Sequence, residues 1–200
     1  QQPLFDWGID GWKLDGAATY FSSTLFGKIP VPYRGTSDGL MTTRGYMVHY
    51  YRDEYQHGLT QNPEFVTLSR SQDNQSAILS HPEGFAPLDA SPVNWVGDQD
   101  HEWTIEKEGL EEALRDILKS AEMGYNIIGS DIGGYSGGEI PAKLYMRWAQ
   151  FSTFCGLFLN GGHDERAMWK RSEEELEVIR KFSWLHTELV PYIYTYMVHC

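Results

Sequence analysis

The stretch LEEALRDILKSAEMGYNIIGSD, residues 110–131, contains a helix signal followed directly by a strand signal. Its first half carries apolar residues at helical spacing, and Gly124 fits the position that ends a helix. Residues 126–130 then form a short apolar run typical of a buried strand, which ends at Asp131. The apolar residues of the expected helix are Leu110, Leu114, Ile117, Leu118 and Ala121. A helix followed by a buried strand is the repeating unit of an α/β protein.

The same alternation continues on both sides of this stretch. Apolar runs that end in turn residues predict further strands at 8–14, 64–69, 93–96 and 157–159. Five strands with helices between them imply parallel βαβ units.

Further helices are predicted by their start and stop signals. One covers 42–59 and stops before Pro63, and another opens at Pro141. A last helix opens with the capping box of Ser172 and Glu175, and Pro191 is expected to bend or end it.

The predicted fold class is α/β, as part of a (β/α)8 TIM barrel. A full barrel needs roughly 250 residues, so five units in 200 residues make an incomplete one. The abrupt start of the chain leads us to expect a piece of a longer protein. An open doubly wound sheet is the alternative, but it usually carries a G-x-G-x-x-G loop after its first strand, where this chain has DGAA at 15–18.

The composition describes a folded protein and argues against several partners. A hydrophobic content of 41% is too high for a disordered chain. The formal net charge of −12 disfavours nucleic acid and anionic membranes, because both need clustered Lys and Arg. No apolar run approaches the ~18 residues of a membrane span. Cys155 and Cys200 form neither a disulfide framework nor a metal-like spacing.

Each expected strand ends at a charged or imidazole side chain. In parallel barrels the active site is built at the carboxyl ends of the strands, so these side chains are expected to meet in one mouth. A single Asp at a strand end can equally cap the next helix or turn. Five such ends are harder to explain in this way, because charges brought together without a role are costly. The residues are Asp15, Arg70, Asp98, Asp131 and His163.

Two carboxylates on opposite sides of a pocket are the minimum for glycoside hydrolysis. One attacks the anomeric carbon, and the other protonates the leaving oxygen and later activates water. Lys13 lies on the same strand face as Asp15 and would favour its ionised form. An apolar wall from Trp95 and Trp103 would keep Asp98 protonated.

Five motifs, in order, resemble glycoside hydrolase family 31. They are GIDGWKLD (8–15), SRS (69–71), WVGDQ (95–99) followed by Trp103, GSDIGGY (129–135) and RWAQF (147–151). The resemblance covers nearly the whole chain, from the fourth barrel strand of that family to the eighth and the helix beyond. It implies retaining exo-hydrolysis of α-glycosides without metal or cofactor. Residues 1–200 would then be the C-terminal portion of a catalytic barrel, cut from a longer multidomain chain and packed against the rest of it.

The resemblance also implies roles for individual residues. Asp15 resembles the catalytic nucleophile, and Asp98 resembles the general acid/base. Arg70 resembles the arginine that binds sugar hydroxyls, and Trp95 resembles the tryptophan beside the acid. The implied partner is a carbohydrate with a terminal α-linked sugar, of the α-glucoside or α-galactoside type.

Other positions match less closely. Asp131 and Tyr135 match positions that line the pocket, and His163 would be the hydroxyl-binding histidine, although NGGH at 160–163 carries an extra glycine. The residues after Asp15 include no carboxylate, which suggests a wider pocket or a differently oriented hydroxyl. The motif forms look most like the branch that includes α-galactosidase-type members.

The same residues leave alternatives open. A transglycosylase uses this scaffold with a different acceptor, and a carbohydrate-binding protein could keep the pocket without catalysis. An aldolase-type barrel would need a lysine at a strand tip, whereas Lys13 lies within its strand. A metal cluster at His163, Asp164 and Glu165 is disfavoured, because consecutive loop residues rarely all face one ion.

Overall fold

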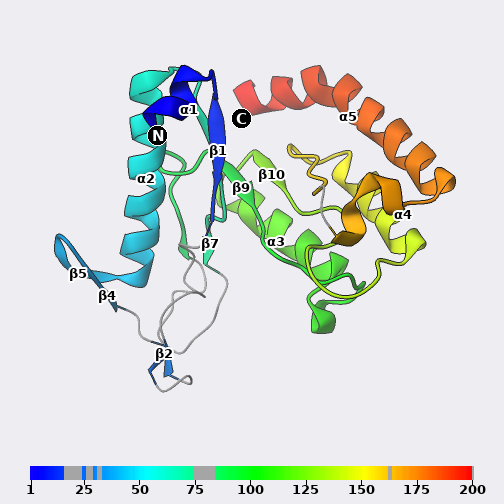
Figure 1. The fold of residues 1–200 in the computed structure, drawn as a ribbon, viewed down its shortest axis with the longest axis horizontal. Coiled ribbons are helices and arrows are strands. Elements are labelled where there is room, and N and C mark those ends of the chain that lie inside the picture. Colours follow the sequence, from blue (N-terminus) through cyan, green and yellow to red (C-terminus); the bar gives the residue numbers. More distant parts are fainter. Residues whose placement is uncertain (16–23, 26–28, 31–32, 74–83, 162–163, 200) are drawn as a thin grey trace. The chain divides into compact units, whose positions relative to one another are not determined.

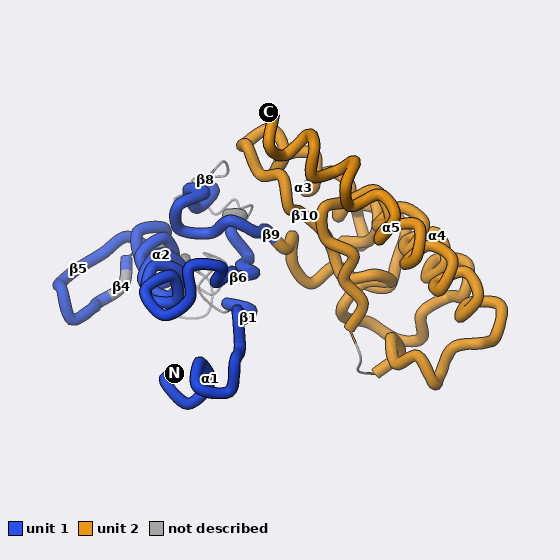
Figure 2. The backbone as a smooth tube through the Cα atoms, turned by 90° about the horizontal axis from the view of Figure 1, so that it is seen from above, with its two compact units in different colours: residues 1–94 blue, residues 95–200 orange. Residues whose placement is uncertain are grey.

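The computed structural model describes residues 1–15, 24–25, 29–30, 33–73, 84–161 and 164–199. The chain divides into two compact units, residues 1–94 and 95–200 (Figure 2). Both units combine strands with helices (Figure 1).

Unit 1 is built on parallel strands and one long helix. Strand β1 spans Gly11–Leu14, β6 spans Val66–Ser69 and β9 spans Val93–Trp95, whose last residue belongs to unit 2. Helix α2, Thr43–Gln61, lies between β1 and β6 in the chain, and a short helix α1, Gln2–Asp6, precedes β1. The antiparallel pairs, which the sequence did not predict, are β2 (Thr24–Leu25) with β3 (Ile29–Pro30), β4 (Tyr33–Thr36) with β5 (Gly39–Thr42), and β7 (Gln72–Asp73) with β8 (Gly84–Phe85).

The strands of the main sheet in unit 1 pair in parallel. Leu14 of β1 pairs with Ser69 of β6, and Ser69 pairs in turn with Asn94 of β9. Because α2 connects β1 to β6, this is the βαβ order that the alternation predicted.

Local chemistry sets the ends of α2. The Oγ1 atom of Thr42 accepts a 2.9 Å hydrogen bond from the N–H of Gly45, which satisfies one of the unpaired donors of the first turn. At the other end Asn62 is extended, with φ −142° and ψ 115°, because Pro63 disfavours the helical region for the residue before it. The predicted helix over 42–59 is therefore confirmed.

The core of unit 1 lies on the sheet face toward α2. Leu14 packs there with Met47 and Tyr51 of α2, and with Ala86 and Ala90 from the segment before β9. The apolar positions of the strand and helix thus meet on one side of the sheet.

The opposite face of this sheet carries different side chains. Lys13 pairs with Leu68, and Leu68 pairs with Val93, so these three side chains share the face away from α2. The same alternation assigns Asp15 and Arg70 to that face, at the carboxyl ends of β1 and β6.

Unit 2 continues with strand β10, Ile127–Gly129, and helices α3, Leu110–Glu122, α4, Ala142–Ser152, and α5, Glu173–His199. The N–H of Val96 donates to the carbonyl of Gly129 at 3.1 Å, so the chain at the end of β9 runs beside β10. Short 3₁₀ helices are η2 (Ile105–Lys107), η3 (Asp164–Arg166) and η4 (Met168–Lys170).

The predicted strand at 157–159 is only partly formed. The N–H of Leu157 donates to Ile128 at 3.1 Å, and the N–H of Ile132 donates to Leu159 at 2.9 Å. This segment lies parallel to the end of β10, but it is joined there by a single bridge, Asp131 to Leu159, rather than by a ladder. Three residues are too few to continue the pairing once the chain turns away at Asn160.

The buried face of α3 differs from its predicted apolar stripe. Leu114 and Leu118 are 40% and 57% exposed, whereas Ala113, Asp116 and Ser120 are buried. The polar groups can be buried because they are paired. Ser120 donates to the Asp116 carbonyl at 2.7 Å, and the Asp116 carboxylate accepts from Arg115 at 3.1 Å.

Helix α5 begins as predicted but does not end at Pro191. The N–H of Ser172 donates to Oε2 of Glu175 at 2.9 Å, and the N–H of Glu175 donates back to the Ser172 hydroxyl, which confirms the capping box. The helix then runs through Pro191, whose carbonyl accepts from the Thr195 hydroxyl at 2.8 Å. None of the described helices is long and apolar enough to cross a membrane.

Candidate active site

Asp15 and Arg70 follow the parallel strands β1 and β6 of unit 1. Asp15 is exposed, and Arg70 is nearly buried. The buried hydroxyl of Tyr51, on α2, donates a 2.9 Å hydrogen bond to the backbone carbonyl of Arg70. Helix α2 therefore fixes the backbone from which the Arg70 side chain projects.

The residue after Arg70 is anchored as well. The N–H of Ser71 donates to Oδ1 of Asn94 at 2.9 Å, and its hydroxyl bonds to that of Ser91. These three residues are fully buried. Because a buried hydrogen-bonded network costs much to rearrange, the end of β6 is held in one conformation.

Three buried side chains, two of them from strand ends, meet in unit 2. The indole N–H of Trp95, at the end of β9, donates to Oδ2 of Asp131, which follows β10, at 2.8 Å. Nη1 of Arg166, in η3, donates to Oδ1 of the same carboxylate at 2.8 Å. Trp95, Asp131 and Arg166 are 0%, 3% and 2% exposed. Each oxygen of the buried carboxylate thus has a donor, and its charge has a cation beside it.

Arg166 also contacts the aromatic ring of Tyr135. The guanidinium carbon lies 5.0 Å from the ring centroid, within the range of a cation–π interaction. Gly161 leaves the space that the guanidinium fills, since a Cβ at this position would lie 2.4 Å from its central carbon. The chain reaches this arrangement because residue 161 has no side chain.

Asp98 lies on the loop after β9 and is half-buried. The loop turns at Gly97, whose φ of +110° favours glycine. On the other side of Asp98, the carbonyl of Gln99 accepts hydrogen bonds from the N–H groups of Tyr135 and Ser136, at 2.7 and 3.3 Å. The loop that carries Asp98 is therefore joined to the loop that carries Tyr135.

Two further contacts join the same loops. Nδ1 of His101, which is buried, lies 2.7 Å from the carbonyl of Gly133, and the N–H of His101 donates to the Ser136 carbonyl at 2.9 Å. The Ser136 hydroxyl donates to the carboxylate of Asp100. His101 is consequently a structural residue of this loop pair.

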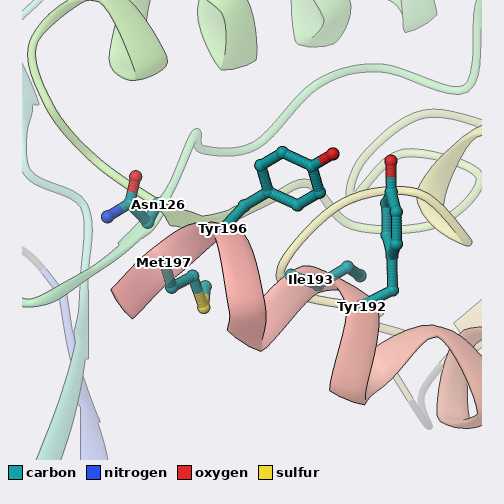
Figure 3. A pocket seen from close by; sticks show the side chains of 5 residues that line it. All are labelled: Asn126, Tyr192, Ile193, Tyr196 and Met197. Carbon is teal, nitrogen blue, oxygen red and sulfur yellow. The ribbon is translucent and has the colours of Figure 1, made fainter. Parts of the chain in front are cut away.

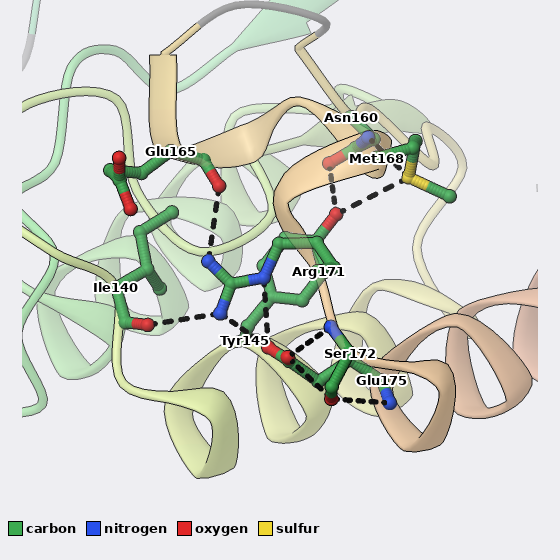
Figure 4. A network of polar contacts seen from close by, with 8 residues as sticks. All are labelled: Ile140, Tyr145, Asn160, Glu165, Met168, Arg171, Ser172 and Glu175. Carbon is green, nitrogen blue, oxygen red and sulfur yellow. Dashed lines mark hydrogen bonds and ion pairs between the residues drawn. The ribbon is translucent and has the colours of Figure 1, made fainter.

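Arg171 holds the loop that contains Arg166 (Figure 4). Its Nη1 donates to the carbonyl of Glu165 and its Nη2 to that of Ile140, both at 3.0 Å, and its guanidinium pairs with Glu175. Burial works to raise the pKa of Glu175, but hydrogen bonds from Ser172 and Arg171 outweigh it and lower that pKa below its ordinary value.

Tyr145 of α4 supports the start of this loop (Figure 4). Its hydroxyl donates to Oδ1 of Asn160 at 2.9 Å, and its ring lies under the guanidinium of Arg171, 4.8 Å from the guanidinium carbon. Burial raises the pKa of Tyr145, so the hydroxyl remains a neutral donor. The loop is thus fixed at residue 160 and again at residue 171.

His163 lies outside the described residues, so its predicted role stays a prediction. Of the acidic residues that follow it, Asp164 is exposed and Glu165 pairs with Lys170 at 3.1 Å. Within the described ranges, no group of three His, Cys, Asp or Glu side chains is placed to hold a metal ion.

An open pocket of about 340 Å³ in unit 2 lies away from these strand ends. It is lined by Asn126, Tyr192, Ile193, Tyr196 and Met197 (Figure 3). Asn126 precedes β10, whereas Asp131 follows it, so the pocket is at the amino end of that strand. In a barrel the chemistry takes place at the carboxyl end.

Sequence reasoning missed Arg166 and Tyr51. Arg166 lies in a loop of several charged residues, and nothing in its spacing distinguishes it from its neighbours. Tyr51 lies within the pattern of a helix, and that pattern predicts only that its side chain packs. A buried arginine reveals its role only when its carboxylate partner is located.

Comparison with known proteins identifies the family. The model of the glycosyl hydrolases family 31 TIM-barrel domain matches residues 1–196. The chain belongs to glycoside hydrolase family 31. The predicted fold class is therefore confirmed: the parallel strands and their helices are part of a (β/α)8 barrel.

Relatives within family 31 carry several names. The alpha-xylosidase of Emericella nidulans is 28% identical over 194 residues, which are 95% of this chain and 22% of that protein. The 1,3-alpha-isomaltosidase of Kribbella flavida is 26% identical over 200 residues, which are 92% of this chain and 24% of that protein. The chain thus spans less than a quarter of the length of these relatives. Their names give no support to the α-galactosidase type that the motif forms suggested.

Solved structures share the fold. The cycloalternan-forming enzyme of Listeria monocytogenes, in complex with a pentasaccharide substrate, has a TM-score of 0.70 and 22% identity, covering 97% of this chain and 17% of that one. The cycloalternan-degrading enzyme of Trueperella pyogenes has a TM-score of 0.71 and 24% identity, covering 98% of this chain and 27% of that one. A complex of the Trueperella enzyme with a covalent intermediate has a TM-score of 0.69 and 22% identity, covering 98% of this chain and 26% of that one.

Proposed function

We propose that this chain forms part of the catalytic barrel of an exo-acting retaining α-glycosidase. The observation that carries the proposal is the family 31 barrel match over residues 1–196, within which Asp15 and Asp98 follow parallel strands at their carboxyl ends. The substrate is a carbohydrate with a terminal α-linked sugar.

Asp15 is the proposed nucleophile. Its carboxylate attacks the anomeric carbon as the bond to the leaving oxygen breaks, and a covalent glycosyl-enzyme forms. Lys13, two residues before Asp15, lies on the same strand face. The structure of the Trueperella enzyme in complex with a covalent intermediate supports the same two-step route.

Asp98 is the proposed general acid/base. It gives its proton to the leaving oxygen in the first step and takes a proton from water in the second, so that the enzyme returns to its starting state. Its half-buried position on a loop held at both ends suits a group whose reach must be fixed.

The remaining strand-end residues bind the sugar in this proposal. Arg70, Asp131 and His163 hold hydroxyls, and Trp95 and Tyr135 line the pocket. The backbone anchors of Arg70 and the buried pairing of Asp131 support this, because binding groups act best when their positions are fixed before substrate arrives.

The names of the relatives narrow the choice of sugar in the proposed substrate. Xylosidase, isomaltosidase and glucosidase activities all concern α-linked sugars with gluco or xylo configuration. We therefore infer an α-glucoside or α-xyloside substrate in preference to an α-galactoside.

Transglycosylation is the second candidate. One structure with the same fold is named a cycloalternan-forming enzyme, so a barrel of this kind can serve synthesis. The chemistry is shared, and only the acceptor that reaches the covalent intermediate differs.

The test uses the complete protein with aryl α-glycosides of gluco, xylo and galacto configuration. The first sugar product is followed by proton NMR, which separates retention from inversion. Release of the α-anomer supports the proposal, and release of the β-anomer overturns it. Added acceptor sugar that appears in products at the expense of free sugar identifies a transglycosylase. Tight binding of sugars with no turnover identifies a binding protein and overturns the enzymatic proposal.

A further inference from the structure

The ends of three successive parallel segments in unit 2 are joined by one chain of side chains. Trp95 ends β9, Asp131 follows β10, and Arg166 belongs to the loop after residues 157–159. The two hydrogen bonds that link them, from the indole N–H and from the guanidinium to the two oxygens of one carboxylate, are both 2.8 Å long.

Because these three side chains are buried, the position of each depends on the other two. Asp131 and Arg166 are almost completely buried, so removal of either partner is costly to the other. If the guanidinium were removed, one oxygen of the buried carboxylate would lose this donor and the carboxylate would shift. That shift disturbs the acceptor that holds the indole of Trp95.

Two of the supports of the Asp98 loop involve Arg166. Trp95 stands three residues before Asp98 and is held through Asp131. Tyr135, whose N–H donates to the carbonyl of Gln99 directly after Asp98, lies with its ring against the guanidinium. One buried side chain thus contacts Tyr135 directly and reaches Trp95 through Asp131.

We propose that Arg166 is a positioning residue for Asp98, acting through Asp131 and Trp95 on one side and through Tyr135 on the other. The proposal rests on the proposed function, in which Asp98 is the acid/base. Arg166 acts through these residues because its guanidinium is paired with the Asp131 carboxylate and lies against the Tyr135 ring.

The role predicts a particular pattern of lost activity. If Asp98 is displaced, the leaving oxygen is protonated less efficiently. Activity on substrates whose leaving group needs no proton is then retained. In the complete protein, Arg166→Met should lower kcat/KM for alkyl α-glycosides by about 100-fold and for dinitrophenyl glycosides by less than about 10-fold. The alkaline limb of the pH profile of kcat/KM should shift, because it reports ionisation of the acid.

Companion variants separate positioning from general loss of structure. Arg166→Lys keeps the charge and should recover part of the loss for alkyl substrates. Asp131→Asn combined with Arg166→Met should lose little more than either change alone, because the two residues act as a unit. Arg180→Met, on the exposed side of α5, removes a similar side chain and should leave kinetics and melting temperature unchanged.

The opposite results overturn the inference. Equal losses for all leaving groups, with an unshifted pH profile, make Arg166 a structural residue only. If the wild-type protein is active and Arg166→Met has the same kinetics, Arg166 does not position Asp98. A wild-type protein inactive on every glycoside overturns the proposed function first, and the role of Arg166 in proton transfer falls with it.

Discussion

The hydroxyl of Tyr51 donates a 2.9 Å hydrogen bond to the backbone carbonyl of Arg70. Helix α2 thereby reaches the carboxyl end of β6 with a buried polar group, in the middle of an otherwise apolar contact with Leu14. A core residue of a barrel helix sets the position of a proposed sugar-binding arginine.

This contact predicts the effect of Tyr51→Phe. The change removes a hydrogen bond to a buried carbonyl, which costs about 1–3 kcal/mol of stability. Because one of the contacts that fix the Arg70 backbone is lost, KM should rise more than kcat falls. Thermal unfolding and kinetics of the complete protein measure both effects. Tyr194→Phe, at an exposed tyrosine of α5, is the control and should change neither.

Substitution of the two proposed catalytic carboxylates should give different patterns. Asp15→Asn should reduce turnover of every substrate by at least about 10³-fold, because no other group can attack the anomeric carbon. Asp98→Asn should reduce kcat/KM for alkyl glycosides by about 10²–10⁴-fold but spare kcat/KM for dinitrophenyl glycosides, whose leaving group needs no protonation. The kcat of Asp98→Asn should fall even for dinitrophenyl glycosides, because hydrolysis of the glycosyl-enzyme has lost its base. Equal losses for both variants on all substrates would contradict the assignment.

Gly161→Ala tests the space occupied by Arg166. The added Cβ would lie 2.4 Å from the guanidinium carbon, so the buried ion pair with Asp131 must shift. Overpacking of this kind costs about 1–3 kcal/mol. Gly138→Ala is the matched control, since nothing lies within 4 Å of the Cβ that it adds. Equal melting temperatures for the two variants would refute the close contact.

The fold was largely predictable from the sequence, and the reasons are visible at particular residues. Pro63 fixes the end of α2, and Ser172 with Glu175 fixes the start of α5, because these signals act within a few residues. Pro191 was expected to bend or end α5, and the helix does not end there, since a long helix packed along α4 retains enough of its hydrogen bonds to pass one missing donor. The strand at 157–159 was overpredicted, because an apolar run does not reveal how long its pairing lasts.

The candidate site was less predictable. The charged residues at the strand ends could be found from the sequence. Side chains alternate between the two faces of a strand, and this pattern involves only neighbouring residues. The pairing of Asp131 with Trp95 and Arg166 depends on contacts between residues 35 or more positions apart, which no local pattern encodes. Helix α3 is a second example. Its amphipathic spacing predicted an apolar stripe, but it did not predict which face of the helix is buried.

Glu175 predicts a pH dependence of stability. Its pKa is lowered in the folded protein from the ordinary value of 4.5, so its contribution is full above that value and disappears as the pH falls through the lower folded value. Glu175→Gln should therefore lower the melting temperature at pH 7, by an amount equivalent to about 3–5 kcal/mol for a broken buried pair. The difference from the wild type should shrink below pH 4. A constant difference across pH 3–7 would contradict the ionised pair with Arg171.

Cys155 should resist alkylation in the folded protein. Burial raises the pKa of its thiol to about 12, so almost none is thiolate at pH 8. Peptide mass spectrometry after iodoacetamide treatment should find Cys155 unmodified, and modified only after denaturation. Cys155→Ser identifies the peptide and serves as the control. Rapid labelling of the native protein would contradict the burial.

The shared carboxylate of Asp131 also constrains how this barrel can evolve. Loss of the arginine at 166 removes one donor from a buried carboxylate, and loss of the aspartate removes an acceptor from both the guanidinium and the indole N–H. Single changes at positions 95, 131 and 166 should therefore be selected against, and paired changes should be tolerated. Among homologous sequences these three positions should vary together, so the connection between the strand ends is inherited as one unit.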